Sequence, residues 1–273
     1  APLPGLPPPP PRHLPLPASR SPPPMDKALY VAMTGARASL QAQATVSHNL
    51  ANSDTPGFKE ALANTEAFPI QGQGYASRID ALHVDAGFNR RIGAQQITGS
   101  ALDLSLQPGN WLAVQSRDGS EAYTRAGALT LTPNGQLVTA DGNAVLDENG
   151  NPVAVPPHQA IEIGHDGTLS VIPLGEGPQT MAMVGRLRVV QAPDARLQRG
   201  LDGLMRNTDP QQPFAQVQGK ALDSGMLESS NVDAAGALVQ MIQLQRQFEM
   251  QVKVIKHGDE NARSANTLLR LNG

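Results

Sequence analysis

Apolar residues recur at alternating spacings of three and four near both ends of the 273-residue chain. In the first run, from Asp26 to Asn52, no proline interrupts the pattern. Its stripe consists of Leu29, Ala32, Ala36, Ser39, Gln43, Val46 and Leu50. This spacing is typical of a coiled-coil seam and predicts a long helix. Only three of these positions carry Leu or Val, and each such side chain contributes about 1.5–3 kcal/mol when buried, so this helix needs a partner.

A second stripe lies at the other end of the chain, in a proline-free run over residues 229–271. Its positions are Leu238, Met241, Gln245, Phe248, Val252, Ile255, Asp259, Ala262, Asn266 and Leu269. Ser230 or Asn231 is a plausible N-cap, and Gly258 is expected to mark a bend. Because the two stripes occupy opposite termini, we predict that they pair as one coiled-coil module. The alternative is that each helix packs against its own domain.

Between the helices, short strand-like runs alternate with tight-turn dipeptides. These are Asp118-Gly119, Asn134-Gly135, Asp141-Gly142, Asn149-Gly150 and Asp166-Gly167. Such punctuation predicts antiparallel hairpins, so the expected fold class is α+β, with paired terminal helices and an antiparallel β-rich middle domain. The expected divisions are a Pro-rich disordered leader (1–24), an N-terminal helix (25–55), a connector (56–92), a β-rich domain (93–223) and a C-terminal helix (224–273).

Half of the first 24 residues are proline, which removes backbone donors and favours extended polyproline structure. We interpret this leader as an upstream extension of the gene model, with Met25 as the natural start. The alternative interpretation is a Pro-rich docking tail.

Composition argues against several classes of function. Aromatic residues make up 3% of the chain, with 26 Gly and 24 Pro, which disfavours a large catalytic core. The net charge is -3, and no run of Lys and Arg offers a footprint for nucleic acid. Cysteine is absent, so thiolate metal sites and disulfides are excluded. No stretch approaches the roughly 20 apolar residues of a membrane span.

The sequence also lacks a persuasive arrangement of catalytic or metal-binding residues. Its six histidines show no HExxH spacing. Asp147-Glu148-Asn149-Gly150 faintly resembles a calcium loop, but the Gly comes too early and the bidentate Glu is missing, so a hairpin turn is favoured. We therefore expect no catalytic residue, no metal and no cofactor.

Three blocks of the sequence resemble the flagellar rod and hook family. The first is His48-Asn49-Leu50-Ala51-Asn52 with Gly57-Phe58-Lys59, similar to the signature that closes the family's first helix, although His48 replaces the usual Asn. The second covers residues 98–138 and the third residues 224–255. Residues Trp111 to Val114, together with the sequence FEMQVKVI at residues 248–255, are similar to the proximal-rod branch of the family. The leader has no counterpart in the family.

The resemblance implies a structural subunit of the proximal rod that self-assembles into a torque-transmitting tube and is not an enzyme. It implies contact with other rod subunits, the distal-rod protein, copies of itself and the flagellar export apparatus. It also implies export without a cleaved signal peptide and a place in the periplasm-spanning rod. The alternatives are a distal-rod or hook sibling, or a β-rich module that binds or cleaves cell wall. The expected assembly interface comprises Leu29, Ala32, Ala36, Val46, Leu50, Leu238, Met241, Phe248, Val252, Ile255, Ala262 and Leu269.

Overall fold

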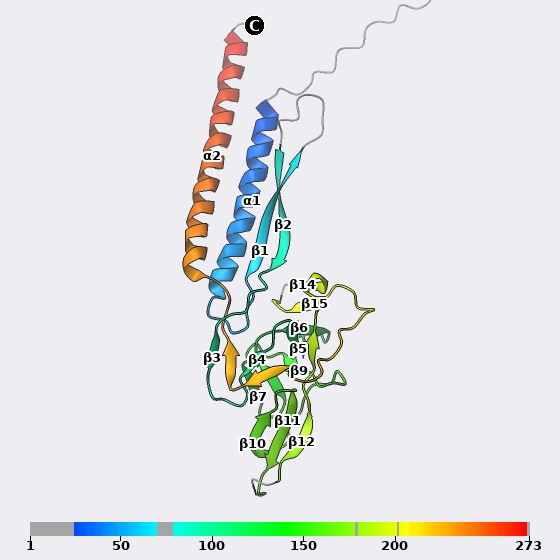
Figure 1. Cartoon of the computed structure of the whole chain (residues 1–273). Coiled ribbons are helices and arrows are strands. Elements are labelled where there is room, and N and C mark those ends of the chain that lie inside the picture. The colour runs from blue at the N-terminus through cyan, green and yellow to red at the C-terminus, as the bar shows by residue number, and fades with distance from the viewer. Residues whose placement is uncertain (1–24, 70–78, 178–179, 201, 272–273) are drawn as a thin grey trace, which may run out of the picture.

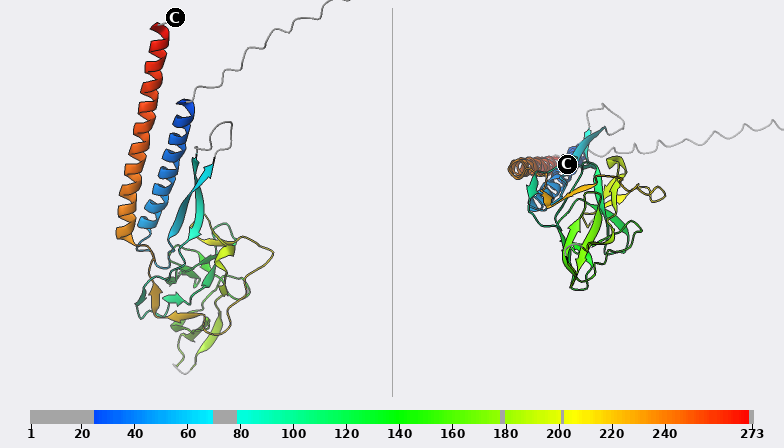
Figure 2. Two further views of the ribbon diagram at one scale, coloured as in Figure 1. Left: turned by 45° about the horizontal axis from the view of Figure 1, so that its top comes forward. Right: turned by 60° about the horizontal axis from the view of Figure 1, so that its bottom comes forward.

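The computed structural model describes residues 25–69, 79–177, 180–200 and 202–271. The Pro-rich leader predicted for residues 1–24 lies outside this range. Two long helices, α1 (Met25–Ala51) and α2 (Ala234–Leu271), stand side by side and project from a β-rich body (Figure 1). The turned views in Figure 2 show the same arrangement. The predicted fold class, two contacting terminal helices with an antiparallel β-rich middle, is therefore confirmed.

The two helices run antiparallel. Near one end of the pair, Gly258 of α2 lies against Leu29 of α1. Farther along, the Ser39 hydroxyl contacts Oε1 of Gln251 at 3.3 Å. Past Gly258 the helix continues without interruption to Leu271 and extends beyond the N-terminal end of α1 (Figure 1).

The cap of α2 differs from the prediction. The side-chain carboxylate of Asp233 accepts a hydrogen bond from the backbone N–H of Ala235 at 3.1 Å. The backbone carbonyl of Asp233 accepts one from the N–H of Ala237 at 2.9 Å. Asp233 therefore takes the capping position. Neither Ser230 nor Asn231 does so. Asn231 is hydrogen-bonded instead to Phe58 and Arg91, in the segments that lead from the helices to the β-rich body.

A hairpin of β1 (Ala61–Pro69) and β2 (Ile79–Phe88) lies along α1 (Figure 1). The order across this part of the molecule is α2, α1 and then the hairpin, so α1 is covered on two sides and α2 on one. We call these four elements the helical arm. Residues 56–92 were expected to be a connector, and the hairpin within them was not foreseen. The sequence of this hairpin lacks the Asp-Gly and Asn-Gly dipeptides that mark the other turns. Each strand is recognised only by its pairing with the other.

The remaining strands form the β-rich body, and they pair antiparallel. Below the helices, β3 (Gln95–Ile97) pairs with β17 (Met226–Glu228) and β4 (Leu104–Leu106) pairs with β16 (Leu222–Ser224). β17 and the last residue of β16 thus occupy the start of the range, 224–273, that was expected to be C-terminal helix. The main sheet has the order β14 (Leu197–Arg199), β15 (Met205–Asn207), β6 (Glu121–Thr124), β5 (Asn110–Gln115), β9 (Ala144–Val145), β8 (Leu137–Thr139), β7 (Leu129–Leu131), with β13 (Val189–Gln191) also on β5. A separate three-stranded sheet has the order β10 (His158–Ile163), β11 (Thr168–Pro173), β12 (Ala182–Arg186). The described residues also include a 3₁₀ turn, η1, at Asp194–Arg196.

The core of this body is aliphatic. Leu104, Leu112, Leu137, Leu169 and Leu222 are fully buried in its main cluster. A smaller cluster gathers the aromatic side chains Trp111, Tyr123 and Phe214. The five predicted turn glycines all have positive φ, as tight hairpin turns require. We call residues 95–228 the β domain, which includes the β3–β17 pair that leads to the arm.

Candidate functional site

The seam between α1 and α2 contains most of the predicted interface residues. On α1, Ala36 and Val46 are buried, and Leu29, Ala32 and Leu50 are partly buried. On α2 the partly buried positions are Met241, Phe248, Val252, Ile255 and Ala262. Leu238 does not belong to this set, because it is 50% exposed while its neighbour Ala237 is buried. The side chain of Leu269 lies outside the described part of the chain.

A second apolar stripe runs along the outer side of α2. Val239, Ile242, Met250, Val254 and Leu268 are 53–62% exposed. With 3.6 residues per turn, Val239, Met250 and Leu268 lie within about 20° of one another around the helix and about 160–180° from Phe248. On α1, Met33 and Leu40 are also about half exposed. We call the α2 set the outer stripe.

The arm meets the β domain at a compact joint. Three segments, residues 52–60, 89–94 and 229–233, pass between the two parts. At their centre lies Glu228, the last residue of β17, only 2% exposed. Its Oε1 accepts hydrogen bonds from Lys59 Nζ at 2.7 Å and from the Gly93 N–H at 3.0 Å. Its Oε2 accepts from Arg125 Nε at 2.9 Å and also from Nη2.

Both cations have further partners at the joint. Arg125 follows β6 and donates to the carbonyl oxygens of Asn110 at 2.6 Å and Leu106 at 2.8 Å. Lys59 precedes β1 and donates to the carbonyl of Arg91 at 2.7 Å. The carboxylate therefore joins a lysine from the arm side to an arginine anchored in the β domain.

Charge and burial act against each other in this cluster. Burial alone would raise the pKa of Glu228, but the charge and hydrogen bonds of Arg125, with those from Lys59 and Gly93, outweigh burial and lower this pKa. Burial lowers the pKa of Lys59, an effect that Glu228 opposes only in part. The two cations that share the Glu228 carboxylate thus favour its ionised form.

Comparisons with known proteins extend over almost the whole chain. Residues 29–59 match the family model "Flagella basal body rod protein", residues 107–171 "Flagellar hook protein FlgE/F/G D1 domain" and residues 223–268 "Flagellar basal body rod FlgEFG protein C-terminal". The chain is 42% identical over 252 residues to the flagellar basal-body rod protein FlgF of Escherichia coli strain K12, covering 90% of the chain and 100% of the relative. The chain belongs to the flagellar basal-body rod protein family.

Two further relatives support this assignment to the rod family. The FlgF protein of Caulobacter vibrioides is 32% identical, covering 88% of this chain and 97% of the relative. The FlgG protein of Bacillus subtilis is 29% identical, covering 86% and 96%. The rod family is structural and not enzymatic. Three different blocks of its sequence supply the joint: Lys59 comes from the first, Arg125 from the second and Glu228 from the third.

The asparagines of the rod-family signature tie α1 to the joint. Asn49 is buried, and its side chain pairs with the backbone of Ala61, donating to the carbonyl at 2.9 Å and accepting from the N–H at 2.8 Å. Asn52 caps the end of α1 by donating to the His48 carbonyl at 2.8 Å. No described non-glycine residue adopts positive φ, so neither asparagine uses the left-handed geometry considered for it.

The remaining signature residues lie on the surface of the joint or inside it. Gly57 is buried, with φ +72°, and donates its N–H to the Glu228 carbonyl at 2.7 Å. The Phe58 ring lies 4.9 Å from the Arg199 guanidinium. Leu50 is partly buried, and Ala51 is exposed.

Asn231 connects the third block to the other two segments. Its Nδ2 donates to the carbonyls of Asn89 at 2.9 Å and Arg91 at 2.8 Å, and its Oδ1 accepts from the Glu60 N–H at 2.7 Å. Arg125 and Glu228 were not singled out from the sequence, and Asn231 was considered only as a helix cap. One signal could have found them: each is a polar residue that lies inside a block shared with the family but outside the apolar stripes of the helices.

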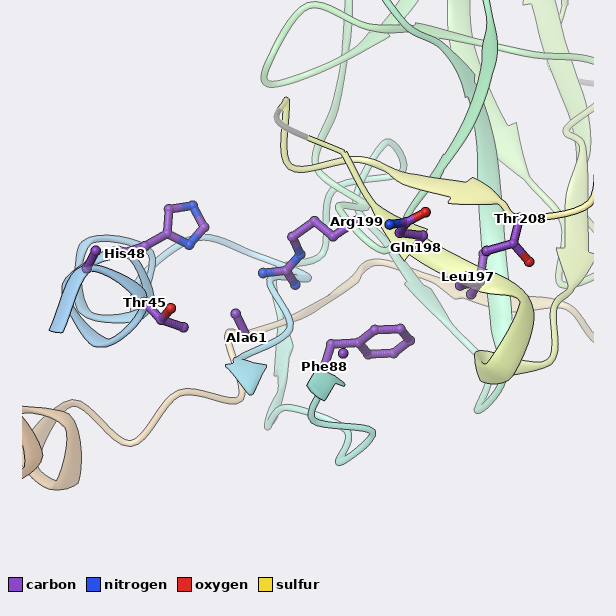
Figure 3. Close-up of a pocket in the computed structure, with 10 residues that line it drawn as sticks. Thr45, His48, Ala61, Phe88, Leu197, Gln198, Arg199 and Thr208 are labelled. Atoms are coloured by element: carbon purple, nitrogen blue, oxygen red, sulfur yellow. The ribbon is translucent and has the colours of Figure 1, made fainter. Parts of the chain in front are cut away.

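An open groove separates the arm from the β domain beside the joint. It has a volume of about 740 Å³ and is lined by Thr45 and His48 of α1, Phe88 of β2, and Leu197 and Arg199 of β14. Figure 3 shows Arg199 reaching from the β domain toward His48 and Thr45. Burial, followed by the charge of Arg199, lowers the pKa of His48. Apolar packing does not fill this side of the junction.

Two other features bear on the sequence expectations. Within the described ranges, neither helix is both long and apolar enough to cross a membrane. Among the same residues, no group of three or more His, Cys, Asp and Glu side chains is arranged to hold a metal ion.

Proposed function

We propose that this chain is a structural subunit of the proximal rod of the bacterial flagellar basal body. In this role it self-assembles with its neighbours into the drive-shaft tube that transmits torque. The observation that carries the proposal is the outer stripe of α2: five large apolar side chains remain exposed on a helix whose opposite side is already paired. Exposed apolar stripes of this length mark interaction surfaces.

The proximal position is supported by the pattern of relatives. The chain is 42% and 41% identical to two FlgF proteins and 32% and 29% identical to two others. The FlgG proteins compared with it are 28–31% identical. A distal-rod or hook sibling is the nearest alternative. Imaging basal bodies that contain a labelled chain distinguishes these roles by the height of the label along the rod. A wall-cleaving module would instead release muropeptides from purified cell wall.

The assembly interface in this proposal has two parts, of which only the first was predicted from the sequence. Seam residues such as Val46, Phe248 and Ile255 hold the two helices of one subunit together. The outer stripe of α2 and the exposed Met33 and Leu40 of α1 then contact neighbouring subunits. Because these surfaces differ, their contact is heterologous, and heterologous contacts that do not close produce open helical filaments.

The neighbours in this proposal are other proximal-rod subunits, the distal-rod protein and copies of the chain itself. The chain reaches its place through the flagellar export apparatus without a cleaved signal peptide. It then becomes part of the rod that spans the periplasm.

The test places two charges on the outer stripe, in the variant Ile242→Asp with Val254→Asp. The matched control is Gln240→Asp with Gln247→Asp, at exposed polar positions of the same helix. Each is expressed in a strain that lacks the chain, and basal bodies are imaged by electron microscopy. The stripe variant is expected to give no complete rod while the purified protein keeps its parental circular dichroism. The control is expected to give normal rods. Normal rods from the stripe variant would overturn the proposal.

A further inference from the structure

Apolar packing between the arm and the β domain is limited: among the described residues, Phe88 of β2 packs against the smaller core cluster. Beyond the joint, neither helix packs broadly on any strand from β3 to β17. Besides the 740 Å³ groove, a cleft of about 520 Å³ opens between Arg91 and Leu197, and one of about 300 Å³ between Thr55 and Trp111. Open space therefore flanks the joint where a tightly packed interface would otherwise resist rotation of the arm.

Most hydrogen bonds at the joint hold the three crossing segments to each other. Asn231 binds the backbone of residues 60, 89 and 91. The ties that reach the β domain are fewer. At the periphery, Arg90 pairs with Asp194 at 3.0 Å, with the Arg90 side chain 73% exposed. Farther in, the partly buried Phe88 packs edge to face on the buried Trp111. In the interior, Gly57 donates its N–H to the Glu228 carbonyl, and Arg199 donates to the Lys59 carbonyl and lies over the Phe58 ring. The interior tie that carries charge on both sides is the Lys59–Glu228–Arg125 cluster, with all three side chains at most 4% exposed.

We infer that Glu228 is a positioning residue that locks the arm at one angle to the β domain, acting through Lys59 and Arg125. A buried ion pair adds little net stability, because desolvation offsets the attraction, whereas separating its members leaves an unpaired buried charge at high cost. Such a cluster therefore penalises every orientation except the one in which all partners meet. Lys59 is fixed to the arm, Arg125 is fixed to the main sheet, and the forked carboxylate fits both only at this angle.

The inference concerns the isolated subunit and does not depend on the rod function. Because the chain contains no cysteine, introduced cysteines are the sole sites for spin labels. Arg37→Cys on α1 and Thr130→Cys on β7 are exposed positions in the two parts. Distances between the labels are measured by double electron–electron resonance on the full chain. The parent is expected to give one narrow distribution.

Glu228→Gln is expected to broaden that distribution by about twofold or more, because the neutral amide leaves two buried cations without their anion. Glu121→Gln is the matched control, since it removes a carboxylate from the Glu121–Arg188 pair elsewhere in the β domain, and it is expected to leave the width unchanged. A second label pair within the arm, Arg37→Cys with Gln243→Cys, should also keep its parental distance.

Lys59→Met is the second variant, because it keeps the Glu228–Arg125 pair and disconnects only the arm side. It is expected to broaden the arm-to-domain distance as Glu228→Gln does, and it decides the question if Glu228→Gln does not fold. A parental width in Lys59→Met, or in a folded Glu228→Gln, overturns the inference. Because no rod is needed, this outcome is independent of the assembly test.

Discussion

Gly57 and the carbonyl of Arg125 approach so closely that a Cβ at Gly57 would lie 2.1 Å from the carbonyl oxygen. The same glycine has φ +72° and donates its N–H to Glu228. Two blocks that are far apart in the sequence thus meet backbone to backbone, beside the pair formed by the side chains of Arg125 and Glu228.

Gly57→Ala is expected to destabilise the folded chain by more than about 2 kcal/mol, because left-handed strain of about 1–2 kcal/mol adds to displacement of the Arg125 backbone. The matched control is Gly119→Ala, whose φ is +82° with nothing within 4 Å of the new Cβ. The control should lose only about 1–2 kcal/mol. Urea unfolding measures both, and equal losses would contradict the close approach.

Acid is expected to weaken the joint. The folded-state pKa of Glu228 is lowered from its ordinary value of 4.5, so its ionised form contributes stability above that value. This contribution is lost as the pH falls below 4.5 and through the folded-state pKa. The free energy of unfolding should be measured for the parent and for Glu228→Gln from about pH 7 to about pH 3.

The difference in free energy of unfolding between the parent and Glu228→Gln reports the contribution of Glu228, because the other carboxylates titrate in both proteins. Asp202, for example, has its pKa lowered to about 2, chiefly by a hydrogen bond from Arg206, and it titrates in both proteins. The stability advantage of the parent should shrink as the solution becomes more acidic. An advantage that stays constant down to about pH 3 would contradict the assigned pKa direction.

Leu112→Ala is expected to cost about 2–5 kcal/mol, since it opens a cavity in the aliphatic core. Leu112 is fully buried on β5, where the main sheet is paired on both sides. Leu174→Ala provides the control, because that side chain is 65% exposed, and its effect should stay within about 0.5 kcal/mol. Thermal unfolding of both variants tests this placement of the core.

Asn49→Ala is expected to loosen α1 from the hairpin. The change leaves the N–H and carbonyl of Ala61 without their side-chain partners, at a cost of about 1–3 kcal/mol. Amide hydrogen exchange should quicken at Ala61 and its neighbours. Asn64→Ala, at an exposed position on β1, should leave exchange unchanged, and parental protection in Asn49→Ala would exclude the proposed pairing.

The elements that local chemistry determines were predictable from the sequence. Proline-free stripes of period 3.5 gave both helices, and Asp-Gly and Asn-Gly dipeptides gave the hairpin turns. Errors arose where contacts over long sequence distances decide. Leu238 was placed in the seam although its neighbour Ala237 is the buried residue. At 100° per residue Leu238 lies about 80° from Phe248 around the helix, and spacings of three and four did not distinguish the two neighbours. The hairpin β1–β2 was missed because each strand depends on its partner.

The joint was hidden for the same reason. Lys59 and Glu228 are 169 positions apart, and no periodicity connects them. Lys59 was noted only as part of the signature shared with the rod family. The role of its charge is apparent only in the fold, which brings the Glu228 carboxylate next to it. The same motif also includes Asn49, whose tie to Ala61 is a tertiary contact rather than a helix cap.

α2 is held to the β domain at one end only and has 38 residues, so at about 1.5 Å per residue it is a lever about 57 Å long. An angular error of about 10° at its base would displace its far tip by about 10 Å, which is a full spacing between the axes of two packed helices. Copies whose bases differed by that amount would therefore miss each other's grooves at the tip. Whether many copies can share one lattice therefore depends more on a uniform angle at the base of α2 than on the strength of the apolar contacts along it.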